Sequence, residues 1–189
     1  RGAGNLLGRE QSGDIYSVGF DLYLKLLDEA VQRLSDEHYE PEAEPYLELD
    51  YAGFIPDAYI SMPTVKMEIY KKIASIYNDL DLEALRAELS DRFGPLPDEA
   101  ESLLALAEIR VICRKLSVAN LKERGGIVTV EFSHVAKVSV ERVLRLMRES
   151  GGRIKLDPKR PNVLIIKTGS IGLREKSEFL RERLASLLN

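Results

Sequence analysis

The segment VANLKERGGIVTVEF, residues 118–132, decides the fold class of this chain. It contains two runs rich in β-forming residues, joined by Glu-Arg-Gly-Gly. The second run carries Ile127, Val128, Val130 and Phe132. A glycine pair between two such runs is typical of a tight turn, so the segment predicts a β-hairpin.

Segments on both sides of this hairpin follow helical and strand patterns. Apolar residues at spacings of three and four predict helices at five places: about 63–77, 81–93, 98–116, 139–150 and 172–188. Short β-rich runs predict further strands at three places: YLELDY (46–51), RIKLD (153–157) and NVLIIKT (162–168). Strands and helices in this order predict an α+β domain in which several helices pack on a small, mostly antiparallel sheet.

The N-terminal part of the chain has a different character. Residues 1–15 carry four glycines, which predict a loop with tight turns. An apolar stripe from Phe20 to Leu34 then predicts a long amphipathic helix. The acidic, proline-containing segment that follows, SDEHYEPEAEPY (35–46), reads as a linker. We therefore expect two parts, 1–44 and 45–189.

The composition excludes several classes of function. Among 189 residues, 27 Lys and Arg stand against 31 Asp and Glu, and this net charge of −4 argues against a protein that coats DNA through a basic face. One cysteine and two histidines are too few for a disulfide or a zinc site. The sequence lacks an apolar run long enough to span a membrane, so we expect no membrane association and a cytoplasmic location.

The chain offers no constellation that would make an enzyme by itself. The glycine-rich loop RGAGNLLG (1–8) lacks the third glycine of a dinucleotide fingerprint, because position 7 is Leu7. No Gly-Lys-Ser/Thr follows it, as a phosphate-binding P-loop would require. Cys113 falls within an apolar helix and is expected to be an inert core residue.

Longer motifs carry a family resemblance. RGAGNLLGREQSGDIYSVGFDLYLKLLDEAV (1–31) resembles the TRG ("translocation in RecG") motif of the bacterial transcription-repair coupling factor family, Mfd. Four later segments resemble the C-terminal regulatory domain of the same family: IPDAYI (55–60), EIYKKIAS (68–75), ELSDRFGPLPDEA (88–100) and KLSVANL (115–121). Members are superfamily 2 ATP-dependent translocases on double-stranded DNA that couple transcription to nucleotide excision repair. The chain, which begins at Arg1, is expected to be a fragment of such a protein.

The resemblance implies a role for two residues of the N-terminal loop. Arg1 and Gln11 match the arginine and glutamine that couple ATP hydrolysis to translocation in the family. The alternative is that both residues only pin the loop. The nucleotide-binding motifs of the motor lie outside this sequence, so no cofactor is expected for the fragment, whereas ATP and Mg are expected in the motor domains of the parent protein.

For the C-terminal domain the resemblance implies autoinhibition. In the family this domain docks on the UvrB-like N-terminal module of the same protein and masks the surface that recruits UvrA, and the parent also binds RNA polymerase and double-stranded DNA. Glu88, Asp91 and Arg92 match the docking residues. With about 100° per residue they lie at roughly 240°, 180° and 280°, beside an apolar face centred near 330°.

Two other interpretations stay open. Glu88 and Arg92 are an i,i+4 pair and could form only a surface salt bridge, worth about 0.3–0.5 kcal/mol. Lys66 and Lys72 replace arginines typical of the family, and because lysine cannot make bidentate contacts they are left out of the docking set.

The alternative function is a nucleic-acid- or RNA-polymerase-binding module without an autoinhibitory role. Its basic residues would be those in and around the last predicted turn: Lys155, Lys159, Arg160 and Lys167.

Overall fold

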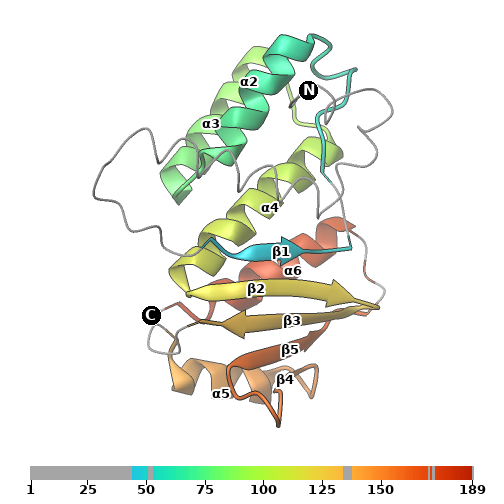
Figure 1. Cartoon of the computed structure of the whole chain (residues 1–189). Helices are drawn as coiled ribbons and strands as arrows, with labels where there is room; N and C mark the ends of the chain where they lie inside the picture. Colours follow the sequence, from blue (N-terminus) through green and yellow to red (C-terminus); the bar gives the residue numbers. More distant parts are fainter. Residues whose placement is uncertain (1–43, 51–52, 134–137, 170, 172, 189) are drawn as a thin grey trace, which may run out of the picture. The chain divides into compact units, whose positions relative to one another are not determined.

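The computed structural model describes residues 44–50, 53–133, 138–169, 171 and 173–188 (Figure 1). In chain order its elements are β1 (Tyr46–Glu48), α2 (Pro63–Ala74), α3 (Asp79–Phe93), α4 (Asp98–Lys115), β2 (Val118–Arg124), β3 (Ile127–Phe132), α5 (Val140–Glu149), β4 (Ile154–Leu156), β5 (Val163–Lys167) and α6 (Leu173–Ala185). The α+β prediction is therefore confirmed. The predicted loop and helix of residues 1–34 lie outside the described residues.

The described residues fall into two compact units. One unit holds residues 53–108 and the other holds residues 44–50 and 109–188, so α4 contributes to both. The predicted boundary between residues 44 and 45 lies where the described part begins, and it stays a prediction. Among the described residues, no helix has the length and apolar character needed to cross a membrane.

The second unit is built on a five-stranded sheet in the order β1-β2-β3-β5-β4. Three of its strand pairs are antiparallel and only β1 pairs in parallel, with β2. Both predicted hairpins are present. The first turns at Gly125 and Gly126, whose φ angles of +57° and +75° suit glycine and confirm the Gly-Gly turn.

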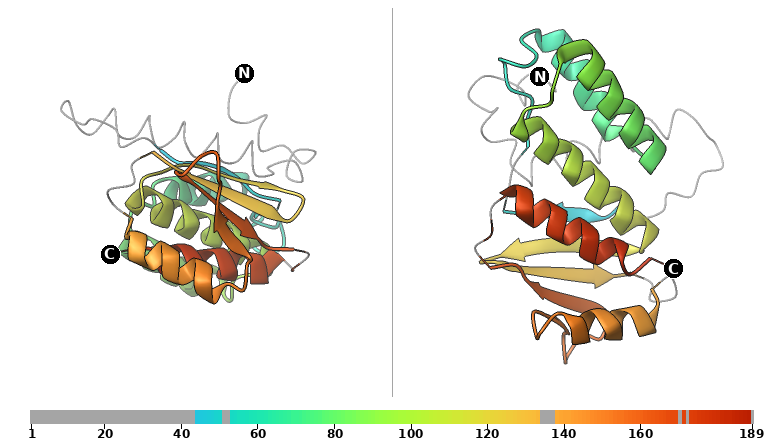
Figure 2. Two further views of the ribbon diagram at one scale, coloured as in Figure 1. Left: turned by 90° about the horizontal axis from the view of Figure 1, so that it is seen from below. Right: turned by 180° about the vertical axis from the view of Figure 1, so that it is seen from behind.

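Helices cover one face of this sheet. Figure 2 shows α5, α6 and the second half of α4 on the same side of the strands. The side chains that alternate toward these helices are fully buried, among them Leu121, Val130 and Leu164. Burial of this apolar layer against the helices is the main stabilising term of the unit.

A buried carboxylate interrupts the apolar layer. Glu123 of β2 has no exposed surface. Its carboxylate lies 2.7 Å from Nζ of Lys176 on α6 and accepts the amide of Asp50 at 2.8 Å. Removing one member of such a buried pair leaves the other charge uncompensated, so this contact fixes α6 and the end of β1 relative to the sheet.

In the first unit, the helix ends depart slightly from the predicted ones. The helix predicted to end at Tyr77 ends at Ala74, where the Ser75 hydroxyl donates to Lys71 O at 2.8 Å. The helix predicted from residue 81 begins at Asp79, because Asn78 is its N-cap. The reciprocal hydrogen bonds of Asn78 and Asp81 thus place the start of α3 two residues earlier than the apolar spacing indicates.

We predict that Gly53→Ala destabilises the first unit. An added Cβ would lie 2.4 Å from the backbone nitrogen and 2.6 Å from the Cα of Leu103 on α4, so the backbone would have to move. The expected loss is about 1–3 kcal/mol in the free energy of unfolding, measured by urea denaturation. Ser61→Ala, at an exposed loop position, is the control and should change little. Equal stability of both variants would contradict this prediction, because it would show that α4 shifts to accommodate the added methyl group at no cost in free energy.

Candidate functional site

The three predicted docking residues all lie on α3. Glu88 is half-buried, whereas Asp91 and Arg92 are exposed. Arg1 and Gln11 lie outside the described residues, so their predicted role is not addressed by the structure. Within the part of the chain that is described, no group of three or more His, Cys, Asp or Glu side chains is arranged to hold a metal ion.

Local interactions fix where α3 begins. The Asn78 side chain accepts the amide of Asp81 at 2.9 Å, and the Asp81 carboxylate accepts the amides of Tyr77 and Asn78 in return. This reciprocal capping satisfies amides that the helix itself leaves without partners. Along the helix, Leu82, Leu85 and Leu89 are buried. Because this apolar stripe is buried, it fixes the direction in which Glu88 and Arg92 project from the helix.

An aromatic side chain holds the other end of α3. The Tyr59 hydroxyl lies 2.9 Å from Gly94 O and 3.1 Å from Leu89 O, so its proton is shared between two carbonyls at the helix end. Burial raises the pKa of this hydroxyl, with the charge of Glu101 a smaller cause. The Tyr59 ring meets Phe93 edge-on at 5.8 Å, and the Arg92 guanidinium stacks over Phe93 at 4.8 Å. Arg92 is thereby held close to the helix end.

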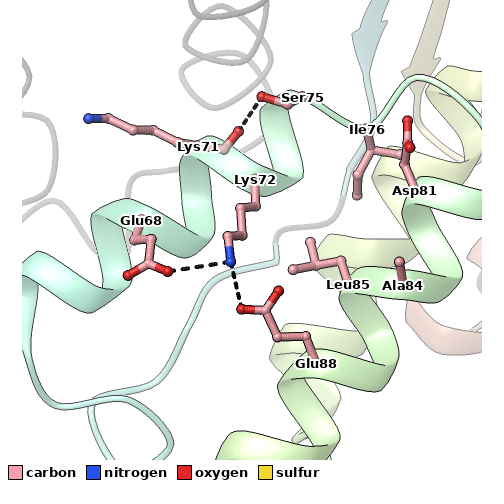
Figure 3. Close-up of a pocket in the computed structure, with 9 residues that line it drawn as sticks. All are labelled: Glu68, Lys71, Lys72, Ser75, Ile76, Asp81, Ala84, Leu85 and Glu88. Carbon is pink, nitrogen blue, oxygen red and sulfur yellow. Dashed lines mark hydrogen bonds and ion pairs between the residues drawn. The ribbon is translucent and has the colours of Figure 1, made fainter.

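Four charged side chains from two helices form what we call the α2–α3 charge cluster: Glu68, Lys72, Glu88 and Arg92. Glu88 lies 2.6 Å from Lys72 and 2.8 Å from Arg92. Glu68 lies 3.4 Å from each of the same two cations. Figure 3 shows the Lys72 ammonium between the two carboxylates. The surface salt bridge expected between Glu88 and Arg92 is thus present, but as part of a larger network.

The contacts within the cluster shift the pKa values of Glu88 and Lys72. The pKa of Glu88 is lowered, first because Lys72 donates to its carboxylate and second because Arg92 does. The pKa of Lys72 is raised, chiefly by its hydrogen bond to Glu88. Two carboxylates and two cations balance, so the cluster is electrically neutral near pH 7.

Asp91 stands apart from this network. It is exposed and lies one helical turn after Glu88 on the same side of α3. Among the described residues, its carboxylate has no ion-pair or hydrogen-bond partner. Asp91 therefore carries an uncompensated negative charge beside a neutral cluster.

A shallow groove runs between the two helices, with a volume of about 480 Å³ (Figure 3). Ile76 and Leu85 supply apolar surface, and Glu68, Lys72 and Glu88 lie along its wall. Sequence reasoning missed Glu68 and omitted Lys72. Their pairing with Glu88 depends on how α2 packs on α3, and the one available signal was the Glu68–Lys72 spacing of four on a helix.

The fold and the α2–α3 charge cluster together define the class of this protein. It is a small α+β domain that presents a charged surface formed by two helices. The family model of the TRCF domain matches residues 49–143, which include the whole of α2 and α3. This match covers half of the chain, so the chain belongs to the TRCF domain family.

Named relatives agree with this assignment. The chain is 32% identical over 184 residues to the transcription-repair-coupling factor of Borreliella burgdorferi. This match covers 97% of this chain and 16% of that protein. It is 39% identical over 157 residues to that of Haemophilus influenzae, covering 79% of this chain and 13% of that protein. The chain thus spans only a small part of the length of these curated relatives.

A solved structure also resembles this chain. It is the crystal structure of the C-terminal domain of a transcription-repair coupling factor, and it matches with a TM-score of 0.69 at 26% identity. The match covers 77% of this chain and 92% of that one. The resemblance found in the sequence motifs is therefore confirmed at the level of family and fold.

We predict a pH-dependent contribution of Glu88 to stability. Because its pKa is lowered in the folded state, the stabilising effect is present above the ordinary glutamate pKa and is lost as the pH falls through the lower folded pKa. The gap in unfolding free energy between wild type and Glu88→Gln should be at most about 1 kcal/mol at neutral pH, since the cluster is solvent-exposed in part. It should shrink towards pH 3. Glu83→Gln, at an exposed position of α3, is the control, and a gap that is constant with pH would contradict the role of the cluster.

Proposed function

We propose that this chain is the C-terminal regulatory part of an ATP-dependent translocase on double-stranded DNA that couples transcription to nucleotide excision repair in the bacterial cytoplasm. Membership of the TRCF domain family and the likeness to a C-terminal domain of a transcription-repair coupling factor support this proposal. The ATP and magnesium of the motor would be bound by segments outside this chain.

In this proposal, α3 docks on the UvrB-like N-terminal module of the same protein and masks its UvrA-binding surface. The observation that carries the proposal is the exposed, uncompensated carboxylate of Asp91 beside the neutral α2–α3 charge cluster. Glu88 and Arg92 already have partners, so docking would exchange their ion pairs, whereas Asp91 would gain one. Such an exchange suits a reversible clasp, for which coupling energies of about 1–3 kcal/mol are usual.

The N-terminal segment has a separate role in the proposal. Arg1 and Gln11 would couple ATP hydrolysis to movement along DNA, and the support for this is the TRG-like sequence of residues 1–31. Engagement of RNA polymerase by the parent protein would release the clasp and expose the UvrA-binding surface.

We predict that Asp91→Arg in the full-length parent protein opens the clasp. The reversed charge would repel the cation that Asp91 meets in the docked state, so basal ATPase activity and UvrA affinity should both rise by about fivefold or more. ATP turnover without RNA polymerase and UvrA binding by calorimetry measure the two effects. The matched control is Glu83→Arg, which makes the same charge change on the opposite flank of α3 and should leave both values within twofold.

Unchanged ATPase activity and UvrA affinity in Asp91→Arg would contradict autoinhibition through α3. If RNA polymerase binding alone falls, the domain is an RNA-polymerase-binding module, which is the alternative function. Equal effects of Asp91→Arg and Glu83→Arg would show that the response follows net charge and not the docking surface.

A further inference from the structure

The small net charge of the chain conceals a separation of charge along the sequence. Residues 109–189 carry 18 Lys and Arg against 8 Asp and Glu, a net charge of +10. Residues 1–108 carry a net charge of −14. Such an asymmetry between two parts of a chain is typical of a polyanion-binding region next to an acidic one. The sheet-containing unit also includes Glu44, Glu48 and Asp50, and it still carries a net positive charge. The expectation drawn from the overall charge therefore does not extend to this unit.

The strand register places several of these cations on one face of the sheet. Glu48, Lys122, Thr129, Ile165 and Lys155 pair in one row across all five strands. Arg124, Ile127 and Lys167 pair in the next parallel row. Arg153 extends this second row, because its carbonyl accepts the Lys167 amide at 2.8 Å. We call the cations of these two rows the basic band: Lys122, Arg124, Arg153, Lys155 and Lys167.

The basic band lies on the face away from the helices. Residues that alternate with it, such as Leu121, Val128 and Ile166, are fully buried under the helices described above (Figure 2). All five cations of the basic band are exposed. Adjacent strands lie about 4.8 Å apart and the two rows about 7 Å apart, so the band covers roughly 14 Å by 7 Å.

Few acidic groups neutralise the basic band. Glu48 pairs with Arg124 at 2.6 Å. Among the described residues, the other four cations have no acidic partner. Glu131 lies in the adjacent row of the same face, and its carboxylate accepts from the Asn120 side chain at 3.0 Å. The described part of this face therefore carries an excess of positive charge.

The chemistry of the face favours a phosphate backbone over exposed bases. Tyr46 is the one aromatic side chain that the described strands place here, and the Lys122 ammonium lies over its ring at 5.6 Å. Binding of single strands depends on open aromatic rings on which bases stack. A duplex instead presents about one negative charge per 1.7 Å of its axis, so the length of the basic band faces several phosphates.

We propose that the basic band is a sequence-independent binding surface for the phosphate backbone of duplex nucleic acid. The proposal is independent of docking through α3, because it uses other residues in the other unit. The sheet favours this role because its strands hold the cations in two fixed rows. The arginines and lysines would contact phosphates while releasing bound counterions, which makes the binding steeply salt-dependent.

The test is fluorescence anisotropy of the 189-residue chain with a labelled random-sequence DNA duplex of about 20 base pairs, across about 20–200 mM salt. Wild type should bind at low salt. Arg153→Gln with Lys167→Gln should weaken binding about tenfold and lower the salt-dependence slope by about 2. The matched control, Arg145→Gln with Arg148→Gln, removes the same charge from exposed positions of α5 and should change the affinity less than twofold.

Three outcomes would overturn the proposal. The first is the absence of duplex binding at the lowest salt. The second is equal weakening in both double variants, which would mean that net charge alone drives binding. The third is tighter binding of poly-glutamate than of duplex, which would assign the basic band to an acidic protein partner.

Discussion

The carboxylate of Glu88 accepts hydrogen bonds from Lys72 on α2 and from Arg92 one turn along its own helix. This one group therefore links two helices and sets the charge pattern of their shared surface. Glu68 closes the network by pairing with the same two cations. A surface that is already internally paired binds a partner only by exchanging contacts. In the proposed clasp, that constraint would let the docking face hold the protein closed and still release it under modest free energies.

Local signals made most of the fold predictable from the sequence. The Gly-Gly turn and the apolar spacings each act within a few residues, and the helices and hairpins that they predict among the described residues are present. The parallel pairing of β1 with β2 was beyond such signals, since it joins residues more than 70 positions apart. The buried role of Glu123 was equally hidden, because its partner Lys176 lies on a helix at the far end of the chain.

The candidate site was predictable only in part for the same reason. Glu88 and Arg92 share one helix, so their pairing follows from spacing. The contribution of Lys72 required knowledge of how α2 packs against α3, and its replacement of a family arginine pointed away from it. The net charge also conceals a local separation of charge, because summing over the chain cancels an acidic part against a basic one. Strand register, which is a property of the folded state, gathers the cations of the basic band into rows.

The central claim is that the α2–α3 surface is covered in the intact parent protein. Amide hydrogen exchange compares its backbone in the full-length protein with that in the 189-residue chain alone, and it reads out protection residue by residue. The account predicts slower exchange for residues around 84–93 of α3 in the full-length protein, with unchanged exchange in α5. Identical exchange of α3 in both proteins would show that the surface stays open, and would contradict the claim.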